Sequence, residues 1–195
     1  MWRTGGTYAI RAERIRSDAV KESRAVARVV MLVTTCVFIN YIDRGNLATV
    51  ASAIHDELRL SATQVGVLFS AFYYSYVVCM PGMGWLAERY GAKRVLAAGL
   101  TIWSVATFLT GFAGSFAMLL MLRILLGIGE SVTFPCASKV LAQAVERGRL
   151  GVANGVMSFG YLLGPAVGTL LGGYLMIQFG WRSVFVLFGA LSLLW

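Results

Sequence analysis

The sequence predicts an all-α protein that crosses a membrane several times. Hydrophobic residues make up 58% of the 195 residues and charged residues only 13%, whereas a soluble domain carries about 25% charged residues. The apolar residues are gathered in long stretches, and a helix needs about 20 such residues to cross a bilayer. Short charged segments separate these stretches. Most of the chain is therefore expected to face lipid or other helices.

A basic segment and six apolar stretches divide the chain. We interpret residues 1–28 as a cytoplasmic basic tail, with a helix on the membrane surface as the alternative. Residues 29–195 form the predicted transmembrane bundle, in which Ser61 opens the second helix. We expect five spans at about residues 29–54, 61–86, 95–113, 116–144 and 152–179.

The sixth stretch begins at Trp181 and reaches Trp195. It is too short to cross a hydrocarbon core of about 30 Å. We therefore expect the last span to be incomplete and the chain to be a fragment, a truncated product or half of a longer design.

The basic residues predict the orientation of the bundle. The tail, the loop Glu88–Arg94 and the loop at 146–149 hold nearly all of them, and the alternate loops hold only Arg59 and Arg182. Because basic loops stay in the cytoplasm, the N-terminus is predicted to be cytoplasmic. This distribution follows the loops of a membrane protein and does not form one binding face, so no nucleic-acid partner is expected.

An internal repeat relates the two parts of the bundle. The segment that begins at Gly84 matches the segment that begins at Gly173 at a constant offset of 89 residues, including an aromatic-glycine pair at each helix end. The first copy ends on the inner side and the second on the outer side. The sequence therefore predicts an inverted three-plus-three repeat, which is typical of secondary transporters.

Two adjacent charges lie within the first apolar stretch. Asp43 is 14 residues past Val29, roughly 21 Å along a helix. Each buried charge costs at least about 2.5 kcal/mol, so intramembrane charges indicate a functional site. The alternatives for Asp43 and Arg44 are a structural ion pair, or a span that ends at Asn40.

The fourth stretch contains a second charged face. Arg123, Gly127 and Glu130 are spaced i, i+4, i+7 and share one side of a helix. We expect this side to face a cavity that the small Gly127 leaves open, with Glu130 paired to Arg44 or Arg123. The alternative for Arg123 is a position near the interface, where its charge reaches water.

Two further features are assigned different roles. Tyr76 is a candidate ligand for a carboxylate or hydroxyl, with apolar packing as an equal alternative. In the fifth stretch, a glycine at every fourth position predicts close helix packing, and a proline adds a bend. The residues of this motif are Gly160, Gly164, Pro165 and Gly168.

Because the sequence holds no metal-ligand cluster and no nucleophile motif, we predict no catalytic residue, no metal and no cofactor.

These motifs resemble those of the major facilitator superfamily. The loop after the second stretch is similar to a loop motif of that family, with Glu88 where the family usually has aspartate. Its residues are Gly84, Glu88, Arg89, Gly91, Lys93 and Arg94. The segments Asn40–Leu47, Phe69–Phe72 and Arg123–Glu130 resemble motifs of the anion:cation symporter branch.

The resemblance implies the N-terminal six-helix half of a twelve-helix transporter in a bacterial inner membrane, with a missing second half as partner. Its substrates would be sugar acids or aromatic carboxylates, carried with protons. It implies that Tyr41, Arg44 and Tyr76 contact the substrate, assisted by Arg123. Asp43 and Glu130 would take protons. The glycine motif at 160–168 is similar to that of antiporters, so an exchanger is the alternative, followed by an inactive remnant and, last, a membrane enzyme.

Overall fold

All regular structure in the described part of the chain is helical, as predicted. The computed structural model describes the backbone of residues 5–195 and the side chains of residues 20–195. Its helices are α1 (Gly5–Leu58), α2 (Ala62–Tyr90), α3 (Ala92–Thr110), α4 (Phe116–Glu130), α5 (Thr133–Ala144), the short 3₁₀ helix η1 (Arg147–Arg149), α6 (Leu150–Phe179) and α7 (Trp181–Leu194).

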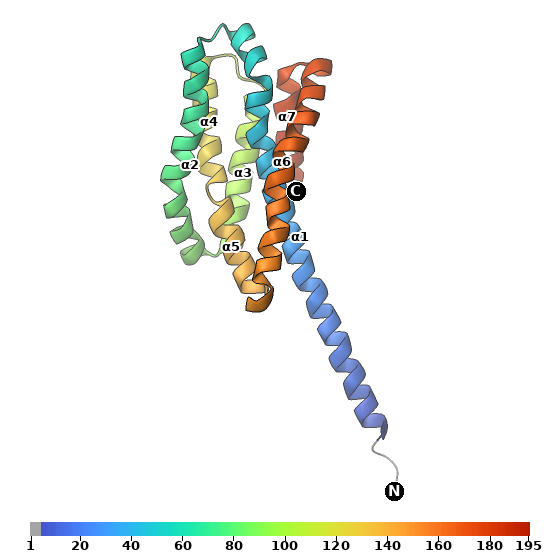
Figure 1. Cartoon of the computed structure of the whole chain (residues 1–195). Coiled ribbons are helices and arrows are strands. Elements are labelled where there is room, and N and C mark those ends of the chain that lie inside the picture. Colours follow the sequence, from blue (N-terminus) through green and yellow to red (C-terminus); the bar gives the residue numbers. More distant parts are fainter. Residues whose placement is uncertain (1–4) are drawn as a thin grey trace.

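The first two helices differ in how they begin: α1 starts far outside the bundle, and α2 starts at a capped serine. The backbone of α1 runs from Gly5 into the bundle without a break, and its first part projects beyond the other helices (Figure 1). The side chains of residues 1–19 lie outside the described residues, so the role of the predicted tail stays a prediction. Ser61 begins α2 as predicted: its hydroxyl accepts from the Gln64 amide at 3.1 Å, and the Gln64 side chain accepts from the Ser61 amide at 2.8 Å. This reciprocal pair is a capping box.

Five described segments have the length and composition of membrane spans, close to the predicted positions. They are Val20–Leu58, Ala62–Tyr90, Ala92–Thr110, Phe116–Ala144 and Arg147–Phe179. The helix α7 is apolar but has only 14 residues. The fourth span is broken between α4 and α5. Pro135 explains this break, because its ring excludes the carbonyl of Ser131 from a regular helical turn.

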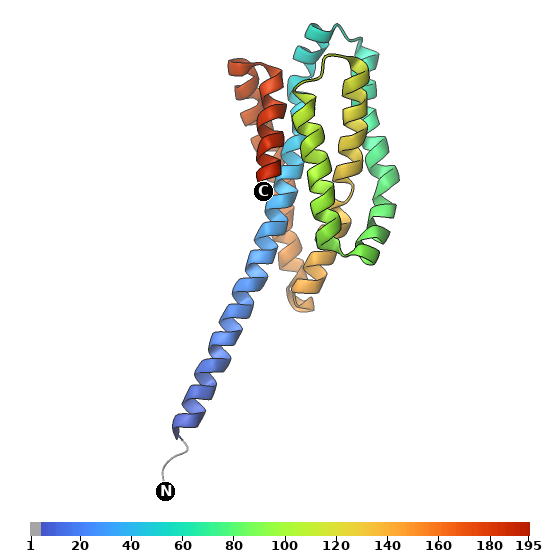
Figure 2. The same cartoon turned by 180° about the vertical axis from the view of Figure 1, so that it is seen from behind.

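The spans alternate in direction. The helices α1, α3 and α6 run one way, and α2, the pair α4 and α5, and α7 run the other way (Figure 1 and Figure 2). In both views α1 lies between α6 with α7 on one side and α2 to α4 on the other. At the upper end of Figure 1, Glu57 accepts from Trp181 Nε1 at 2.6 Å and pairs with Arg182. Arg182 also donates to the Ala113 carbonyl at 3.1 Å, so three segments are tied together at this end.

Two glycines confirm the predicted inverted repeat. Gly91 joins α2 to α3 with φ +89°, and Gly180 joins α6 to α7 with φ +80°. They are 89 residues apart and are the only glycines with positive φ in the part of the chain described. The two junctions lie at opposite ends of the bundle (Figure 1). A side chain at either position would strain the backbone, so both sharp turns require glycine.

The glycines of α6 pack against the backbone of α1, as predicted. A Cβ at Gly160 would lie 2.7 Å from the Thr34 carbonyl oxygen, and one at Gly164 would lie 2.7 Å from Tyr41 Cβ. The same kind of contact joins α4 to α2, where a Cβ at Gly127 would lie 2.5 Å from the Phe72 carbonyl oxygen. The expectation that Gly127 leaves a cavity open is therefore wrong: the backbone of α2 fills that space.

Candidate functional site

A buried ion pair joins the first and fourth spans. Arg44 Nε donates to Glu130 Oε2 at 2.8 Å. The side chain of Glu130 is fully buried and that of Arg44 is 14% exposed. Glu130 is the last residue of α4, before the break at Ser131. Of the two partners predicted for Glu130, the structure selects Arg44.

Aromatic rings enclose the guanidinium of Arg44. Its Cζ lies 4.5 Å from the ring centroids of Tyr41 and Tyr76 and 5.5 Å from that of Phe72. Rings at these distances attract a cation through their negative faces. Tyr76 is buried, whereas Tyr73 on the same helix is 56% exposed. The structure thus brings three predicted substrate residues, Tyr41, Arg44 and Tyr76, into one cluster.

Asp43 lies on a different side of α1 from Arg44. Its carboxylate accepts from Asn46 Nδ2 at 3.4 Å and from Ser192 Oγ at 3.5 Å, both long contacts. Consecutive helical residues point about 100° apart, which explains why Asp43 faces α7 while Arg44 faces α4. Asp43 forms no ion pair with any residue between 20 and 195, so the alternative of an Asp43–Arg44 pair is not found.

Arg123 is buried in the bundle, so the alternative of an interfacial position is wrong. Its side chain contacts the Phe185 ring at 5.6 Å, and Nη2 donates to Thr110 Oγ1 at 3.5 Å. Within residues 20–195 it has no carboxylate partner. Its charge is therefore balanced only at a distance, by Asp43 and Glu130.

Both arginines line one cavity of about 120 Å³. The volume corresponds to roughly four water molecules at about 30 Å³ each. Among the described residues, Arg44 Nη2 and Arg123 Nε have no hydrogen-bond partner. A small anionic group is the natural partner for two free guanidinium donors. The lining residues are Arg44, Leu47, Ala48, Phe69, Phe72, Tyr73, Arg123 and Leu126.

The predicted loop motif lies away from these charges, at the end of the bundle where α2 meets α3. The carboxylate of Glu88 is 3.6 Å from Lys139 Nζ on α5, and the guanidinium of Arg89 lies 5.4 Å from the Trp85 ring. Lys93 and Arg94 are exposed. The motif therefore lies around the junction at Gly91, and none of its residues lines the cavity that Arg44 and Arg123 share.

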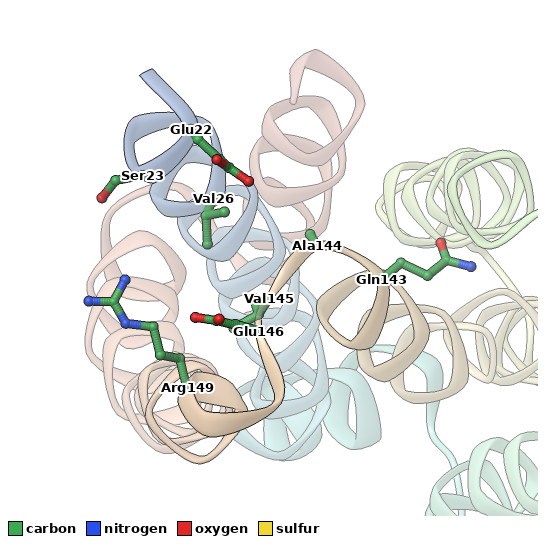
Figure 3. A pocket seen from close by; sticks show the side chains of 8 residues that line it. All are labelled: Glu22, Ser23, Val26, Gln143, Ala144, Val145, Glu146 and Arg149. Carbon is green, nitrogen blue, oxygen red and sulfur yellow. The ribbon is translucent and has the colours of Figure 1, made fainter. Parts of the chain in front are cut away.

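A larger cavity, of about 490 Å³, lies between α1 and the connection from α5 to α6. Figure 3 shows Glu22 and Val26 on α1, opposite Glu146 and Arg149. The sequence reasoning missed it because its residues belong to no motif and come from distant segments. The other lining residues are Ser23, Gln143, Ala144 and Val145. None of the buried charges lines this cavity.

Several curated proteins of similar sequence are named as transporters of organic acids. The chain is 39% identical over 176 residues to a probable sulfoacetate transporter of Cupriavidus necator, covering 89% of this chain and 41% of that protein. It is 30% identical to a probable galactarate/D-glucarate transporter of Escherichia coli, covering 90% and 42%. It is 34% identical to the hexuronate transporter of Bacillus subtilis, covering 80% and 37%. The chain thus spans about two fifths of the length of these relatives.

Solved structures show the same fold. A bacterial homologue of the human lysosomal transporter Spinster, in an inward-facing and occupied conformation, matches with a TM-score of 0.79 at 26% identity. The match covers 86% of this chain and 42% of that one. The model of the Major Facilitator Superfamily matches residues 33–195. This chain, an integral membrane protein, belongs to the Major Facilitator Superfamily.

Proposed function

We propose that this chain is the substrate-binding N-terminal half of a transporter that moves a small organic anion by proton symport. The observation that carries the proposal is the cavity with two buried arginines, whose free N–H groups have no protein partner in the described part of the chain. Arg44 is paired with Glu130, but Arg123 has no carboxylate partner among residues 20–195, and a buried guanidinium without a counter-ion is costly. An anion that enters this cavity would supply the missing charge.

The substrate class follows from the chemistry of the cluster. The planar guanidinium of Arg44 has two parallel N–H donors for a carboxylate or sulfonate, and Tyr41 and Tyr76 flank it. The relatives are named for sulfoacetate, galactarate or glucarate, and hexuronate, which are all organic anions. We propose that Arg44 holds the anionic group of the substrate and that Arg123, which lines the same cavity, assists.

Proton coupling follows from competition for Arg44. A substrate that takes Arg44 leaves Glu130 buried without its counter-charge, and an uncompensated buried carboxylate takes up a proton. Substrate and proton then bind together, as symport requires, and each raises the affinity for the other by the same factor. Asp43 is the second proton-carrying group in this proposal.

Glu130→Gln tests the proposal in the transporter that contains both halves. Glutamine mimics the protonated acid, so the variant should keep substrate binding and counterflow exchange. It should lose the accumulation of substrate that a proton gradient drives. Asp56→Asn, which changes an exposed carboxylate near the end of α1, is the matched control and should accumulate normally. Normal accumulation by Glu130→Gln would remove Glu130 from this role.

Exchange of two solutes is the second candidate. The glycine ridge at 160–168 favours it by its likeness to antiporter motifs, and it packs α6 directly on the helix that carries Arg44. Transport measured in membrane vesicles that contain the complete transporter distinguishes the two mechanisms. An inward proton gradient drives uptake by a symporter and efflux by a proton antiporter. The 195-residue chain alone is not expected to transport substrate, because sites in this fold lie between the two halves.

We further propose a bacterial inner membrane with the N-terminus in the cytoplasm. The end of the bundle with the α2–α3 and α5–α6 connections has Arg89, Lys93 and Arg94 together with Arg147 and Arg149, and basic loops favour the cytoplasm. A cysteine at the exposed Gly148 should resist a membrane-impermeant thiol reagent in intact cells. A cysteine at Gly114, which is exposed at the opposite end, should react. The reverse pattern would invert the orientation.

A further inference from the structure

Polar side chains of α3 lie in the core without partners. Ser104 and Thr107 are at most 1% exposed, yet neither hydroxyl has a hydrogen-bond partner in the described residues. Other hydroxyls of the same helix are satisfied: Thr101 donates to the Ala97 carbonyl at 3.0 Å, and Thr110 donates to that of Ala106 at 2.7 Å. Buried polar groups without partners destabilise a fold and therefore need an explanation.

The packing of α3 shows which way these two hydroxyls face. Trp103 contacts α4, where a Cβ at Gly129 would lie 2.7 Å from the Trp103 nitrogen. Phe108 contacts α7, where a Cβ at Gly189 would lie 2.4 Å from the Phe108 nitrogen. At about 100° per residue, Ser104 and Thr107 lie between these two directions on the helix surface. They therefore face the space between α4 and α7.

The contacts also give the level of Ser104 and Thr107 along the bundle. The helix α7 runs antiparallel to α3 and pairs Gly189 with Phe108, so Ser192 lies near the level of Ser104. Ser192 reaches Asp43. On α4, Gly129 pairs with Trp103 and Arg123 with Thr110, so Ser104 and Thr107 lie between the levels of Glu130 and Arg123.

We infer that Ser104 and Thr107 are positioning residues for proton coupling, which join Asp43 to Arg123 and Glu130 through bound water in the bundle core. The inference rests on the proposed function. Water supplies the hydrogen bonds that the two hydroxyls lack, and a chain of hydrogen bonds lets a proton pass between distant carboxylates. The orphaned oxygens of Asn46 and Glu130 extend the same polar core.

The charged residues around Asp43 do not lie on the proposed path between Asp43 and α4. Arg44 neighbours it on α1, and Arg123 and Glu130 face it from α4. The helix α6 contains no charged residue, and the charged residues of α3 and α7 lie at the ends of the bundle: Lys93, Arg94 and Arg182. Only hydroxyl and amide groups are therefore available between Asp43 and the charges of α4.

Stability separates this role from a structural one. A hydroxyl without a protein partner gives little to the fold, so Ser104→Ala and Thr107→Val should leave Tm unchanged or raise it. In vesicles that contain the complete transporter, the double variant should accumulate substrate at least tenfold less under a proton gradient. Its counterflow exchange should stay within twofold of wild type. Thr107→Ser, which keeps a hydroxyl at this position, should accumulate substrate like the wild type.

An infrared measurement on the 195-residue chain tests the contact without transport. The C=O band of protonated Asp43, identified by its loss in Asp43→Asn, should move to higher frequency in the double variant because it loses a donor. Thr101, on the same helix, has an exposed hydroxyl. Thr101→Val is therefore the control, and it should change neither the C=O band of Asp43 nor the accumulation of substrate. An unshifted band, or a lower Tm with accumulation and exchange falling together, would overturn the inference. Failure of the wild-type transporter to accumulate any organic anion would instead refute the proposed function.

Discussion

Two adjacent residues of α1 occupy opposite kinds of environment. Arg44 is held by a 2.8 Å ion pair to Glu130 and by three aromatic rings. Asp43, one residue earlier and more deeply buried, has only contacts of 3.4 and 3.5 Å to neutral groups. The Arg44 side of α1 is therefore firmly held towards α4 and α2, and the Asp43 side is loosely held towards α7.

The two sides of α1 suit two different roles in transport. A buried ion pair gives little net stability compared with apolar packing, but removal of one partner is costly. Substrate can open the Arg44–Glu130 pair only by replacing one of its charges. Asp43 has no such pair to open, so a proton can join or leave it without breaking a strong contact. The paired face suits recognition and the unpaired face suits proton transfer.

The largest expected effect comes from breaking the paired face. Arg44→Met leaves Glu130 fully buried without a counter-charge, which should lower the free energy of unfolding by about 3–5 kcal/mol. Reversible unfolding of the chain in mixed micelles measures this value. Lys139→Met breaks the exposed pair with Glu88 and should cost less than about 1 kcal/mol.

The double variant Arg44→Met with Glu130→Gln checks the cause of that loss. Because glutamine removes the buried charge, the double variant should recover most of the stability that Arg44→Met loses. A double variant as unstable as the single one would show that Arg44 acts through its packing and not through its charge.

The second expected effect is on recognition. Arg44→Lys keeps the charge but loses the planar fork and the ring contacts. In the complete transporter we expect substrate affinity to fall ten- to a hundredfold, measured by competition in counterflow exchange. Affinity like that of wild type would reduce Arg44 to a structural partner of Glu130 and remove the functional difference between the two faces.

The sequence was sufficient to predict the fold and the charged residues, but not the two environments. The lengths of the apolar stretches predicted the spans. The matching aromatic-glycine pairs that end in Gly91 and Gly180 predicted the inverted repeat. The position of Asp43 and Arg44 within the first apolar stretch was predictable because it depends only on distance along one helix. Which partner each residue meets depends on how α1 is rotated against its neighbours, and close glycine contacts set this rotation. Gly127 illustrates the limit: the sequence shows a small residue but not the backbone that fills its space.

The third expected effect tests the packing that supports the paired face. In Gly164→Ala the new Cβ would lie 2.7 Å from Tyr41 Cβ and 2.8 Å from the Phe38 carbonyl oxygen. Overpacking of this kind typically costs about 1–3 kcal/mol, and it would move Tyr41 away from Arg44. Gly155→Ala, where no atom lies within 4 Å, is the control on the same helix and should be neutral or slightly stabilising. Equal stability of the two variants would show that α6 does not hold α1 in place.

The smallest expected effect concerns the loosely held face. Asp43→Asn preserves the shape of the side chain and removes a charge that has no ion-pair partner among residues 20–195. The contacts to Asn46 and Ser192 are long. An amide oxygen can still accept one of them, and the amide NH2 group can donate to the Ser192 hydroxyl, so the free energy of unfolding should change by less than about 1 kcal/mol, in either direction. The same variant should lose proton-driven accumulation in the complete transporter, so stability and function would separate at Asp43 as they do not at Arg44. A loss of stability near 3 kcal/mol would mean that Asp43 is bound as tightly as Arg44. The two faces of α1 would then be alike, and the assignment of proton transfer to the weaker contacts would fall.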